Sequence, residues 1–402
     1  MLQGIELEQA VKIITENVKQ AEEKEVVGIM DALKRVAAQD VFSDMDNPPF
    51  DRSPLDGYAL IAEDTVAASR ENPIEFKVVE KRFAGDASEL VLKSNQAVRI
   101  MTGAMMPSGA NCVIRQEDTD YGSDVVKIFT PLKAHQNFIY SGEDYKKGTK
   151  LIAAGEKLNF VHLALLASMG LPTITVYKQP KVAVLVTGEE LFPPGLPLNK
   201  GKIYNTNLFF IAARLKELSV NPVYLQQCGD DVEIVVAKMK HALTVADFVI
   251  TTGGVSVGEK DIFHEVLPKL GVDRKFWKVN LKPGTPAMFS TCGDKPVLNL
   301  SGNPFAALAT FELLARPALG KMSRDDSILT SETTGIMDTD FSKKSKGKRF
   351  IRAIYNNGRV ALPQGGHASG MIASMKDCNC LVEIEAGNNG TKKGDTVKVI
   401  LL

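Results

Sequence analysis

Acidic residues follow several apolar segments of this 402-residue chain, at points where strands are expected to end. They are Glu189 and Glu190 after KVAVLVTG, Asp230 and Asp231 after PVYLQQCG, and Asp261 in the loop after DFVIT. Like charges that converge on one crevice are destabilising unless a cation lies among them. Oxygen ligands spread over several loops suit Mg²⁺, which commonly uses one or two carboxylates together with a substrate phosphate. Two plainer interpretations stay open, a helix cap for the Asp230 pair and a solvated turn for the Glu190 pair.

The stretch from Asp247 to Asp261, DFVITTGGVSVGEKD, joins an apolar strand to a helix-like segment through a glycine-rich loop. Gly253 and Gly254 permit positive φ and leave no side chain between backbone N–H groups and a ligand. A helix that begins near Asp261 adds its N-terminal dipole to the same crevice. In open α/β sheets, ligands bind at the carboxyl ends of the strands. The loop therefore predicts an anion-binding crevice, although a glycine pair alone also fits a plain connection.

Two lysines and one further turn belong to the same region. Lys278 and Lys282 are four residues apart, so on an extended strand they would share a face and could hold an oxyanion together. A solvent-facing pair fits the same pattern. Ser301-Gly302-Asn303-Pro304 fits a turn into a helix, with Asn303 as the cap and Pro304 at the first helical position. Phosphate plus a divalent metal is the chemistry that these residues favour.

Other kinds of catalytic site are disfavoured by the motifs that the sequence lacks. It contains neither GxxxxGK[ST] nor GxGxxG followed by an acidic residue, which disfavours P-loop hydrolysis and dinucleotide redox chemistry. It has no HExxH, and none of its 5 His residues is paired with a Cys at a catalytic spacing. Cys378 and Cys380 form a C-x-C pair without a second ligand pair at zinc spacing. Free thiols in a reducing cytosol are therefore expected.

Alternating strands and helices are expected to position these loops. This alternation indicates a doubly wound parallel α/β domain over roughly residues 178–320. Its predicted strands are 181–188, 222–228, 247–251, 276–281 and 296–300, and its predicted helices are 205–218, 230–243, 261–270 and 304–319.

Shorter elements flank this domain. Residues 5–20 and 29–38 are expected to be helical, residues 74–129 predict a small β-rich domain, and residues 330–402 return to short β segments. Lys+Arg and Asp+Glu both number 48, so no global basic field would attract nucleic acid. An apolar run of about 18 residues is absent, and the N-terminus lacks signal-peptide features. We therefore expect a cytoplasmic protein without nucleic-acid or membrane partners.

Motifs along nearly the whole chain, taken in order, resemble those of one family. They are PPFDRSPLDGYA, RIMTGAMMPSGANCVI, GEDYKKGTKL, TGEEL, GKIYNTN, TTGGVSVGEKD, FWKVNLKPGTP, SGNP and GGHASGMIASM. That family is MoeA, the molybdopterin molybdenumtransferases, which is also represented by the C-terminal domain of gephyrin. The resemblance implies that molybdate is inserted into adenylylated molybdopterin in a Mg²⁺-dependent step that releases AMP and molybdenum cofactor.

The resemblance also implies a fold class and partners. The expected protein is an α/β multidomain subunit of an elongated homodimer, with a central MogA-like doubly wound domain, a small β-rich domain, an elongated helical/β linker domain and a C-terminal β domain. Molybdopterin adenylate is the expected ligand, and the upstream adenylyltransferase and apo-molybdoenzymes are further expected partners. The expected domain boundaries are 1–48 with 139–177 for the linker and dimerisation domain, 49–138 for the β-rich domain, 178–322 for the α/β domain and 323–402 for the C-terminal domain.

Roles for individual residues follow from the same resemblance. Catalytic roles fall to Asp56, Thr102, Glu190, Asp230, Asp261, Lys278 and Lys282, with Glu190, Asp230 and Asp261 also as the metal ligands. Cofactor-binding roles fall to Thr187, Gly188, Gly253, Gly254, Ser256, Gly258, Pro283, Gly284, Ser301, Gly302, Asn303, Arg352 and Ser369. In the family, the site lies between the α/β domain of one subunit and the small β domain of the other. This arrangement accounts for the long separation in sequence between Asp56 or Thr102 and the glycine-rich loop.

Two positions depart from the common family pattern. Thr285 stands where KPGKP has its second lysine, which removes one positive charge near a bound phosphate or molybdate. Ser301 stands where PGNP has proline, which alters the stiffness of that turn. Two other functions stay open, an ATP-dependent molybdopterin adenylyltransferase and a non-catalytic molybdopterin-binding scaffold. The retained acids and lysines favour the transferase.

Overall fold

The computed structural model describes residues 1–255 and 262–402, and the chain divides into two compact units. Unit 1 comprises Met1–Val27, Lys34–Ala38 and Thr175–Leu402, and unit 2 comprises Gly28–Leu33 and Gln39–Ile174. The chain first leaves unit 1 within β2 (Lys24–Gly28), returns to it briefly at Lys34–Ala38, and enters it for the last time within β10 (Thr173–Tyr177). The finer division into four domains stays a prediction.

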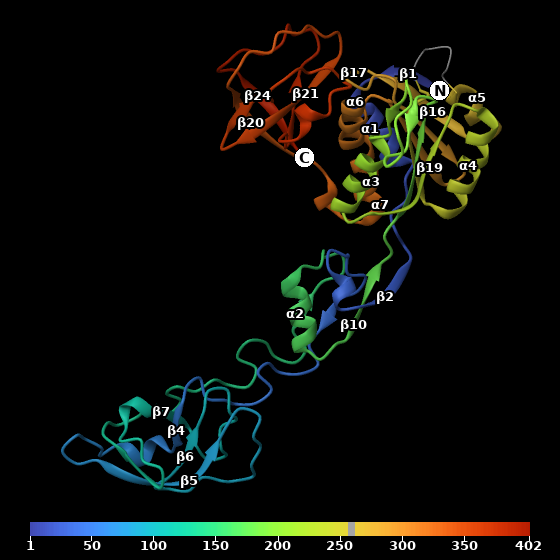
Figure 1. Ribbon diagram of the computed structural model, residues 1–402. Coiled ribbons are helices and arrows are strands. Elements are labelled where there is room, and N and C mark those ends of the chain that lie inside the picture. The colour runs from blue at the N-terminus through green and yellow to red at the C-terminus, as the bar shows by residue number, and fades with distance from the viewer. Residues whose placement is uncertain (256–261) are drawn as a thin grey trace. The chain divides into compact units, whose positions relative to one another are not determined.

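A mixed sheet forms the centre of the α/β part of unit 1 (Figure 1). The last four strands in the order given below run parallel to one another. Where helices cover both of their faces, their residues are almost entirely apolar. The sheet order in the described residues is β1 (Leu2–Ile5), β16 (Asp273–Val279), β18 (Met288–Cys292), β19 (Lys295–Leu300), β15 (Phe248–Thr252), β11 (Lys181–Thr187) and β14 (Asn221–Cys228).

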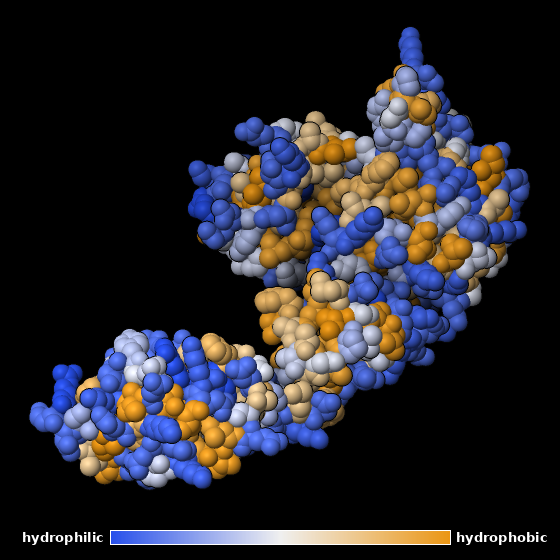
Figure 2. All heavy atoms as spheres, turned by 60° about the horizontal axis from the view of Figure 1, so that its bottom comes forward, coloured by the Kyte–Doolittle hydropathy of each residue, from blue (hydrophilic) through white to orange (hydrophobic). Residues whose placement is uncertain are grey.

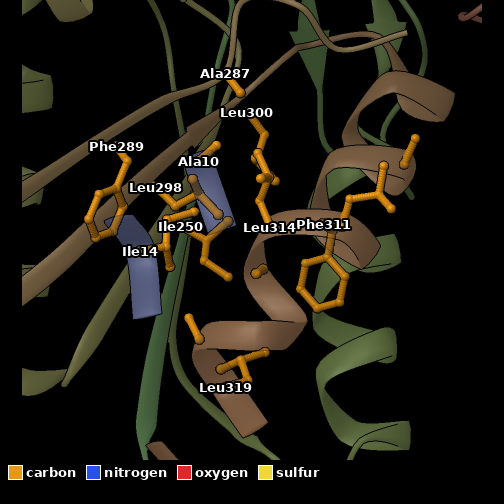
Figure 3. Packing of buried hydrophobic residues seen from close by; sticks show 14 of the residues in the cluster. Ala10, Ile14, Ile250, Ala287, Phe289, Leu298, Leu300, Phe311, Leu314 and Leu319 are labelled. Atoms are coloured by element: carbon orange, nitrogen blue, oxygen red, sulfur yellow. The ribbon is translucent and has the colours of Figure 1, made fainter. Parts of the chain in front are cut away.

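Helices cover both faces of this sheet, as the doubly wound prediction requires (Figure 1). Side chains from the first face, the strands and the segment from α6 to α7 meet in one apolar core (Figure 3). The first face carries α1 (Leu7–Glu16), α3 (Asn207–Glu217), α6 (Pro304–Thr310) and α7 (Arg316–Ser323), and the second carries α4 (Val232–Val245) and α5 (Phe263–Lys269). Phe311–Ala315 is a π-helical turn that joins α6 to α7.

The expectation of a wholly parallel sheet was wrong at one side. Strand β18 runs antiparallel to both β16 and β19. Its residues follow Pro286 and include Ser290 and Thr291, so the segment lacks the long apolar run that marks a buried parallel strand. The short connection to β19 permits a hairpin, whereas a parallel pair needs a longer crossover.

The first residues of the chain also differ from the prediction. Strand β1 pairs with β16, and Ala10 and Ile14 of α1 are buried in the core of the α/β domain. Residues 1–27 therefore belong to unit 1, and the domain boundary expected for the linker domain, 1–48 with 139–177, stays a prediction. The helix expected over 29–38 is only the short 3₁₀ turn Met30–Ala32, and Lys34 then adopts a left-handed conformation with φ of 64°.

The C-terminal part of unit 1 is a closed β barrel. Its sheet order is β17, β21, β22, β20, β24 and β23, and an additional pairing between β21 and β23 closes the ring. The strands are β17 (Leu281–Lys282), β20 (Ser331–Met337), β21 (Lys348–Asn356), β22 (Arg359–Ala361), β23 (Cys380–Ile384) and β24 (Thr396–Leu401). Because β17 follows β16 of the α/β sheet directly, this segment links the barrel to the edge of the candidate site.

Unit 2 contains the predicted small β-rich region. Its main sheet has the order β7 (Cys112–Arg115), β4 (Gly57–Leu60), β6 (Gln96–Ile100), β5 (Ile74–Arg82) and β8 (Val125–Ile128). The pair β3 (Val41–Phe42) and β9 (Lys150–Ile152) and the helix α2 (Phe160–Ser168) complete the unit. Asn159 caps α2 through its side chain, which accepts bonds from Val161 and His162.

Hydrophilic residues cover much of the face shown in Figure 2, with apolar patches between them. None of the helices in the two described ranges combines the length and apolar character needed to span a bilayer. All five cysteines are free thiols, as expected.

Candidate active site

A cleft of about 870 Å³ lies at the carboxyl ends of β11, β14, β15 and β19. Parallel pairing brings the ends of these strands to one edge of the sheet, which is the place predicted for a ligand. Twelve of the predicted site residues line this cleft, namely Thr187, Gly188, Glu190, Asp230, Gly253, Gly254, Pro283, Gly284, Ser301, Gly302, Asn303 and Ser369.

The floor of the cleft requires glycine at residue 253. Its φ is +92°, and a Cβ there would lie 2.3 Å from the carbonyl oxygen of Thr187. Its N–H donates to the carbonyl of Leu300 at 3.2 Å, so the ends of β15 and β19 are held together. Glycine was predicted here because the backbone needs positive φ and leaves no space for a side chain, and both conditions hold. The group that comes close to residue 253 is the backbone of another strand of the protein.

The two predicted metal-ligand carboxylates within the described ranges, Glu190 and Asp230, have different settings. The carboxylate of Glu190 folds over Gly188, where an added Cβ would lie 2.8 Å from Oε2. The neighbouring Glu189 accepts a bond from the Asp230 N–H at 2.8 Å, so it shapes the turn that carries Asp230. Asp231 caps α4 by accepting from Ile234 N–H, which confirms the capping interpretation for that member of the pair. Among described residues the cleft lining contains no lysine or arginine.

The two lysines were expected to lie on the same face of one strand, and they do not. Lys278 has φ of +67°, which breaks the alternation of an extended strand, and its Nζ lies 4.0 Å from the centre of the Trp277 ring. Lys282 belongs to β17, which pairs with the barrel strand β21. Neither lysine lines the cleft. Thr285, at the departure from KPGKP, does line it and donates from Oγ1 to the Leu281 carbonyl at 2.6 Å.

Lys282 instead lines a smaller cavity of about 180 Å³, which we call the basic pocket. Its charged and polar lining consists of Lys282, Lys343, Arg349, His367 and Ser369, and within the described chain it includes no carboxylate. The basic pocket adjoins the cleft because Pro283 and Ser369 line both. Burial, with Arg352 and Lys343 nearby, lowers the pKa of His367, which favours its neutral form.

Arg352 lies behind the loop that carries Ser369 and lines neither cavity. It is fully buried, and its guanidinium lies 4.5 Å from the ring centre of Phe305. It donates to the carbonyls of Gly366 at 2.8 Å and Ala368 at 3.2 Å, and Phe305 N–H donates to the Ser369 carbonyl at 2.8 Å. These contacts hold the Ser369 loop against the start of α6. Burial lowers the pKa of the Arg352 guanidinium.

Asp56 and Thr102 belong to unit 2, and the structure brings these two predicted residues together. The backbone N–H and the Oγ1 of Thr102 both donate to Asp56 Oδ1, each at 2.7 Å. These two bonds hold the pKa of the Asp56 carboxyl below its ordinary value, because they stabilise its charged form. Three predicted residues, Ser256, Gly258 and Asp261, lie outside the described residues.

Sequence reasoning missed several polar residues that line the cleft, among them Asn205, Asn207 and Thr252. Asn207 is the first residue of α3 and donates from Nδ2 to the Gly302 carbonyl at 2.7 Å and to Thr252 Oγ1 at 3.3 Å. The signal available in the sequence was the segment GKIYNTN, which contributes to the family resemblance but was not resolved into individual roles.

Comparison with known proteins covers the whole chain. Three family models match in order, the MoeA N-terminal region (domain I and II) over 5–170, a probable molybdopterin binding domain over 183–321 and the MoeA C-terminal region (domain IV) over 334–402. A molybdopterin molybdenumtransferase from Bacillus subtilis (strain 168) is 36% identical over 99% of this chain and 94% of its own length. One from Staphylococcus aureus (strain Mu50) is 35% identical over 93% of this chain and 90% of its own length.

A solved structure agrees with this result. The crystal structure of a molybdopterin biosynthesis MoeA protein from Pyrococcus horikosii aligns with a TM-score of 0.84 at 30% identity, over 99% of each chain. Sequence and fold therefore agree over almost the full length, and the chain belongs to the MoeA family of molybdopterin molybdenumtransferases.

Proposed function

We propose that this protein inserts molybdate into adenylylated molybdopterin and releases AMP, in a reaction that depends on Mg²⁺. The observation that carries the proposal is that two adjoining cavities have linings of opposite charge. The larger cleft is lined by Glu190 and Asp230, whereas the basic pocket is lined by Lys282, Lys343 and Arg349. The names of the relatives support the same transfer.

The basic pocket suits a small oxyanion. Its volume of about 180 Å³ is a fraction of that of the cleft, and its cations attract an anion such as molybdate. Lys282, next to Pro283 at the boundary between the cavities, is the residue best placed to hold the oxyanion near a pterin in the cleft. Lys278 has a more distant role in this proposal, since it stacks on Trp277.

The cleft suits a divalent cation together with a phosphate. A phosphate beside Glu190 and Asp230 would be repelled, because no lysine or arginine lines the described part of this cleft. Within the described residues no group of three or more potential metal ligands occurs, so two carboxylates and substrate oxygens form the ligand set that fits, with Asp261 as the further proposed ligand. Mg²⁺ held there would neutralise charge on the phosphates of the substrate.

The protein's own groups position the reactants. Backbone N–H groups around Gly253, Gly254 and Gly302 and the hydroxyls of Thr187 and Ser301 are proposed to orient the ligand, with Gly188, Gly284, Asn303 and Ser369 completing the wall. Arg352 is proposed to act through the Ser369 loop that it holds. Ser256 and Gly258 remain proposed contacts.

We also propose that the active form is a homodimer in which the Asp56–Thr102 pair of one subunit serves the cleft of the other. This proposal rests on the family resemblance and on the fact that these two residues belong to a different compact unit from the cleft residues. We further propose that the protein acts in the cytoplasm, receives molybdopterin adenylate from an upstream adenylyltransferase and supplies apo-molybdoenzymes.

The decisive experiment is AMP release by the purified protein from adenylylated molybdopterin with Mg²⁺, with and without molybdate. We expect molybdate to stimulate AMP release and molybdenum to remain on the pterin. Asp230→Asn should slow this release by about 10²-fold or more, since it removes charge stabilisation at the phosphates. Consumption of ATP on free molybdopterin would instead indicate an adenylyltransferase. Bound ligand without AMP release in either condition would indicate a scaffold.

A further inference from the structure

The amide of Asn207 has a fixed orientation at the floor of the cleft. Its Nδ2 donates to the Gly302 carbonyl at 2.7 Å, and a carbonyl oxygen can only accept. Exchanging the nitrogen and oxygen of the amide would place two acceptors against each other at that distance. The Oδ1 is therefore the accepting atom, and the amide ties the start of α3 to the end of β15 and the loop after β19.

This Oδ1 is buried and has no hydrogen-bond partner in the described parts of the chain. Asn207 is only 5% exposed, and it lines the cleft. Thr187, 3% exposed, also lines the cleft and has a buried Oγ1 without a partner in the same described ranges. A buried acceptor without a partner is costly, so a cleft that keeps one is prepared for a donor that arrives with the ligand.

A second asparagine shows that a buried amide oxygen without a partner does not by itself mark a ligand-binding residue. Asn299 donates from Nδ2 to Thr251 Oγ1 at 2.7 Å and also has a buried Oδ1 without a partner in the described chain. It lies within β19 and does not line the cleft. The two asparagines therefore share residue type, burial and a bond to a neighbouring threonine of β15, and they differ in access to the cleft.

We propose that Asn207 determines specificity by accepting a hydrogen bond on Oδ1 from an exocyclic amino group of a heterocycle in the substrate. This inference rests on the proposed function for its ligand, and it adds a recognition residue to that site. Two parts of adenylylated molybdopterin carry such a donor, the amino group of the pterin and the amino group of the adenine. Removal of the acceptor should weaken binding by about tenfold.

The test compares ligands that differ only in the amino group. Wild type, Asn207→Ala and Asn299→Ala are titrated with AMP and purine riboside 5′-monophosphate, and with 6-hydroxymethylpterin and its 2-deamino analogue, each as competitors of bound adenylylated molybdopterin. In the wild type, one pair should show about a tenfold preference for the amino compound, and Asn207→Ala should abolish that preference while Asn299→Ala keeps it. The affected pair identifies the ring that Asn207 contacts.

Three controls separate this role from a structural one. Both variants remove a buried amide, so both should lower the melting temperature, and only Asn207→Ala should change the ligand preference. If Asn207→Ala fails to fold, Asn207→Ser removes the amide oxygen while leaving a smaller gap, and it should also abolish the preference. Preference for the amino compound that is equal in all variants, or absent in the wild type, would overturn the proposal. Because the readout is binding, this result is independent of whether AMP is released.

Discussion

At the scale of single residues, the hydrogen bonds from Thr102 favour the ionised form of the Asp56 carboxylate. Both donors of Thr102 meet one oxygen, Asp56 Oδ1, and no second residue is needed to orient that carboxylate. The pKa of Asp56 is lowered, so its stabilising contribution is complete at neutral pH and is lost as the pH falls through the pKa of the folded state, below the ordinary value of 3.8.

Thr102→Val should therefore raise the pKa of Asp56 and leave the shape of the loop unchanged, because valine keeps the volume of threonine and removes only Oγ1. Because the pair is exposed to solvent, the stability lost at pH 7 should be at most about 1 kcal/mol, and it should disappear below the folded-state pKa. Titration of ¹³C-labelled aspartate by NMR, assigned with Asp56→Asn, measures the change. Thr102→Ser is the matched control and should keep the low value. An unchanged pKa in Thr102→Val would show that the Thr102 hydroxyl does not contribute to lowering it.

The residues of the cleft were predictable to the extent that they follow strand ends. Thr187 ends a buried strand and Gly253 and Ser301 come directly after buried strands, and parallel pairing alone is enough to bring such positions together. Lys278 could not be placed, because its positive φ depends on tertiary contacts and cancels the alternation on which the prediction rested. Asn207 was missed for a similar reason, since its burial requires three loops to meet.

At the scale of elements, the structure of the sheet edge depends on how closely β11 and the loop after β15 approach each other. Gly253→Ala should lower stability by about 3 kcal/mol or more and weaken ligand binding, because a Cβ there would lie 2.3 Å from the Thr187 carbonyl oxygen. Thermal unfolding and titration with adenylylated molybdopterin measure both effects. Gly271→Ala is the matched control, since Gly271 also has positive φ, at +65°, but has open space where its Cβ would lie.

Gly271→Ala should cost only the backbone strain of about 1–2 kcal/mol and leave the affinity for the ligand unchanged. If the two substitutions have equal effects, positive φ explains the glycine at 253 and the close contact does not.

Among the elements, sequence patterns predicted the long helices and missed some of the short strands. Helices such as α3 and α4 were predictable from long apolar periodicity, whereas β1 and β18 are short and depend on neighbouring strands, β16 for β1 and both β16 and β19 for β18.

At the scale of the whole molecule, the proposed dimer can be tested by mixing defective subunits. Asp56→Ala changes unit 2 and Glu190→Ala changes unit 1, so each homodimer should release little AMP. A mixed dimer purified through two different tags should recover about half of the wild-type rate, because one of its two sites would combine intact parts from both subunits.

The control for this experiment is a mixed dimer of Glu190→Ala with Asp230→Ala. Both substitutions lie in unit 1, so every site in that dimer carries one of them and the rate should stay low. Recovery in the control, or none in the Asp56 and Glu190 combination, would contradict sites shared between subunits.

The pairing of β1 with β16 has a consequence for how the protein is made. Leu2 lies opposite Phe276, so β1 leaves the ribosome well before its partner β16, which is synthesised after all of unit 2. Unit 2 can complete its own core from residues that emerge earlier, since domains generally fold as units during synthesis. Until β16 appears, the nascent chain carries an unpaired strand and the apolar face of α1, the kind of surface that chaperones cover. The earliest part of the chain is thus among the last to reach its native place.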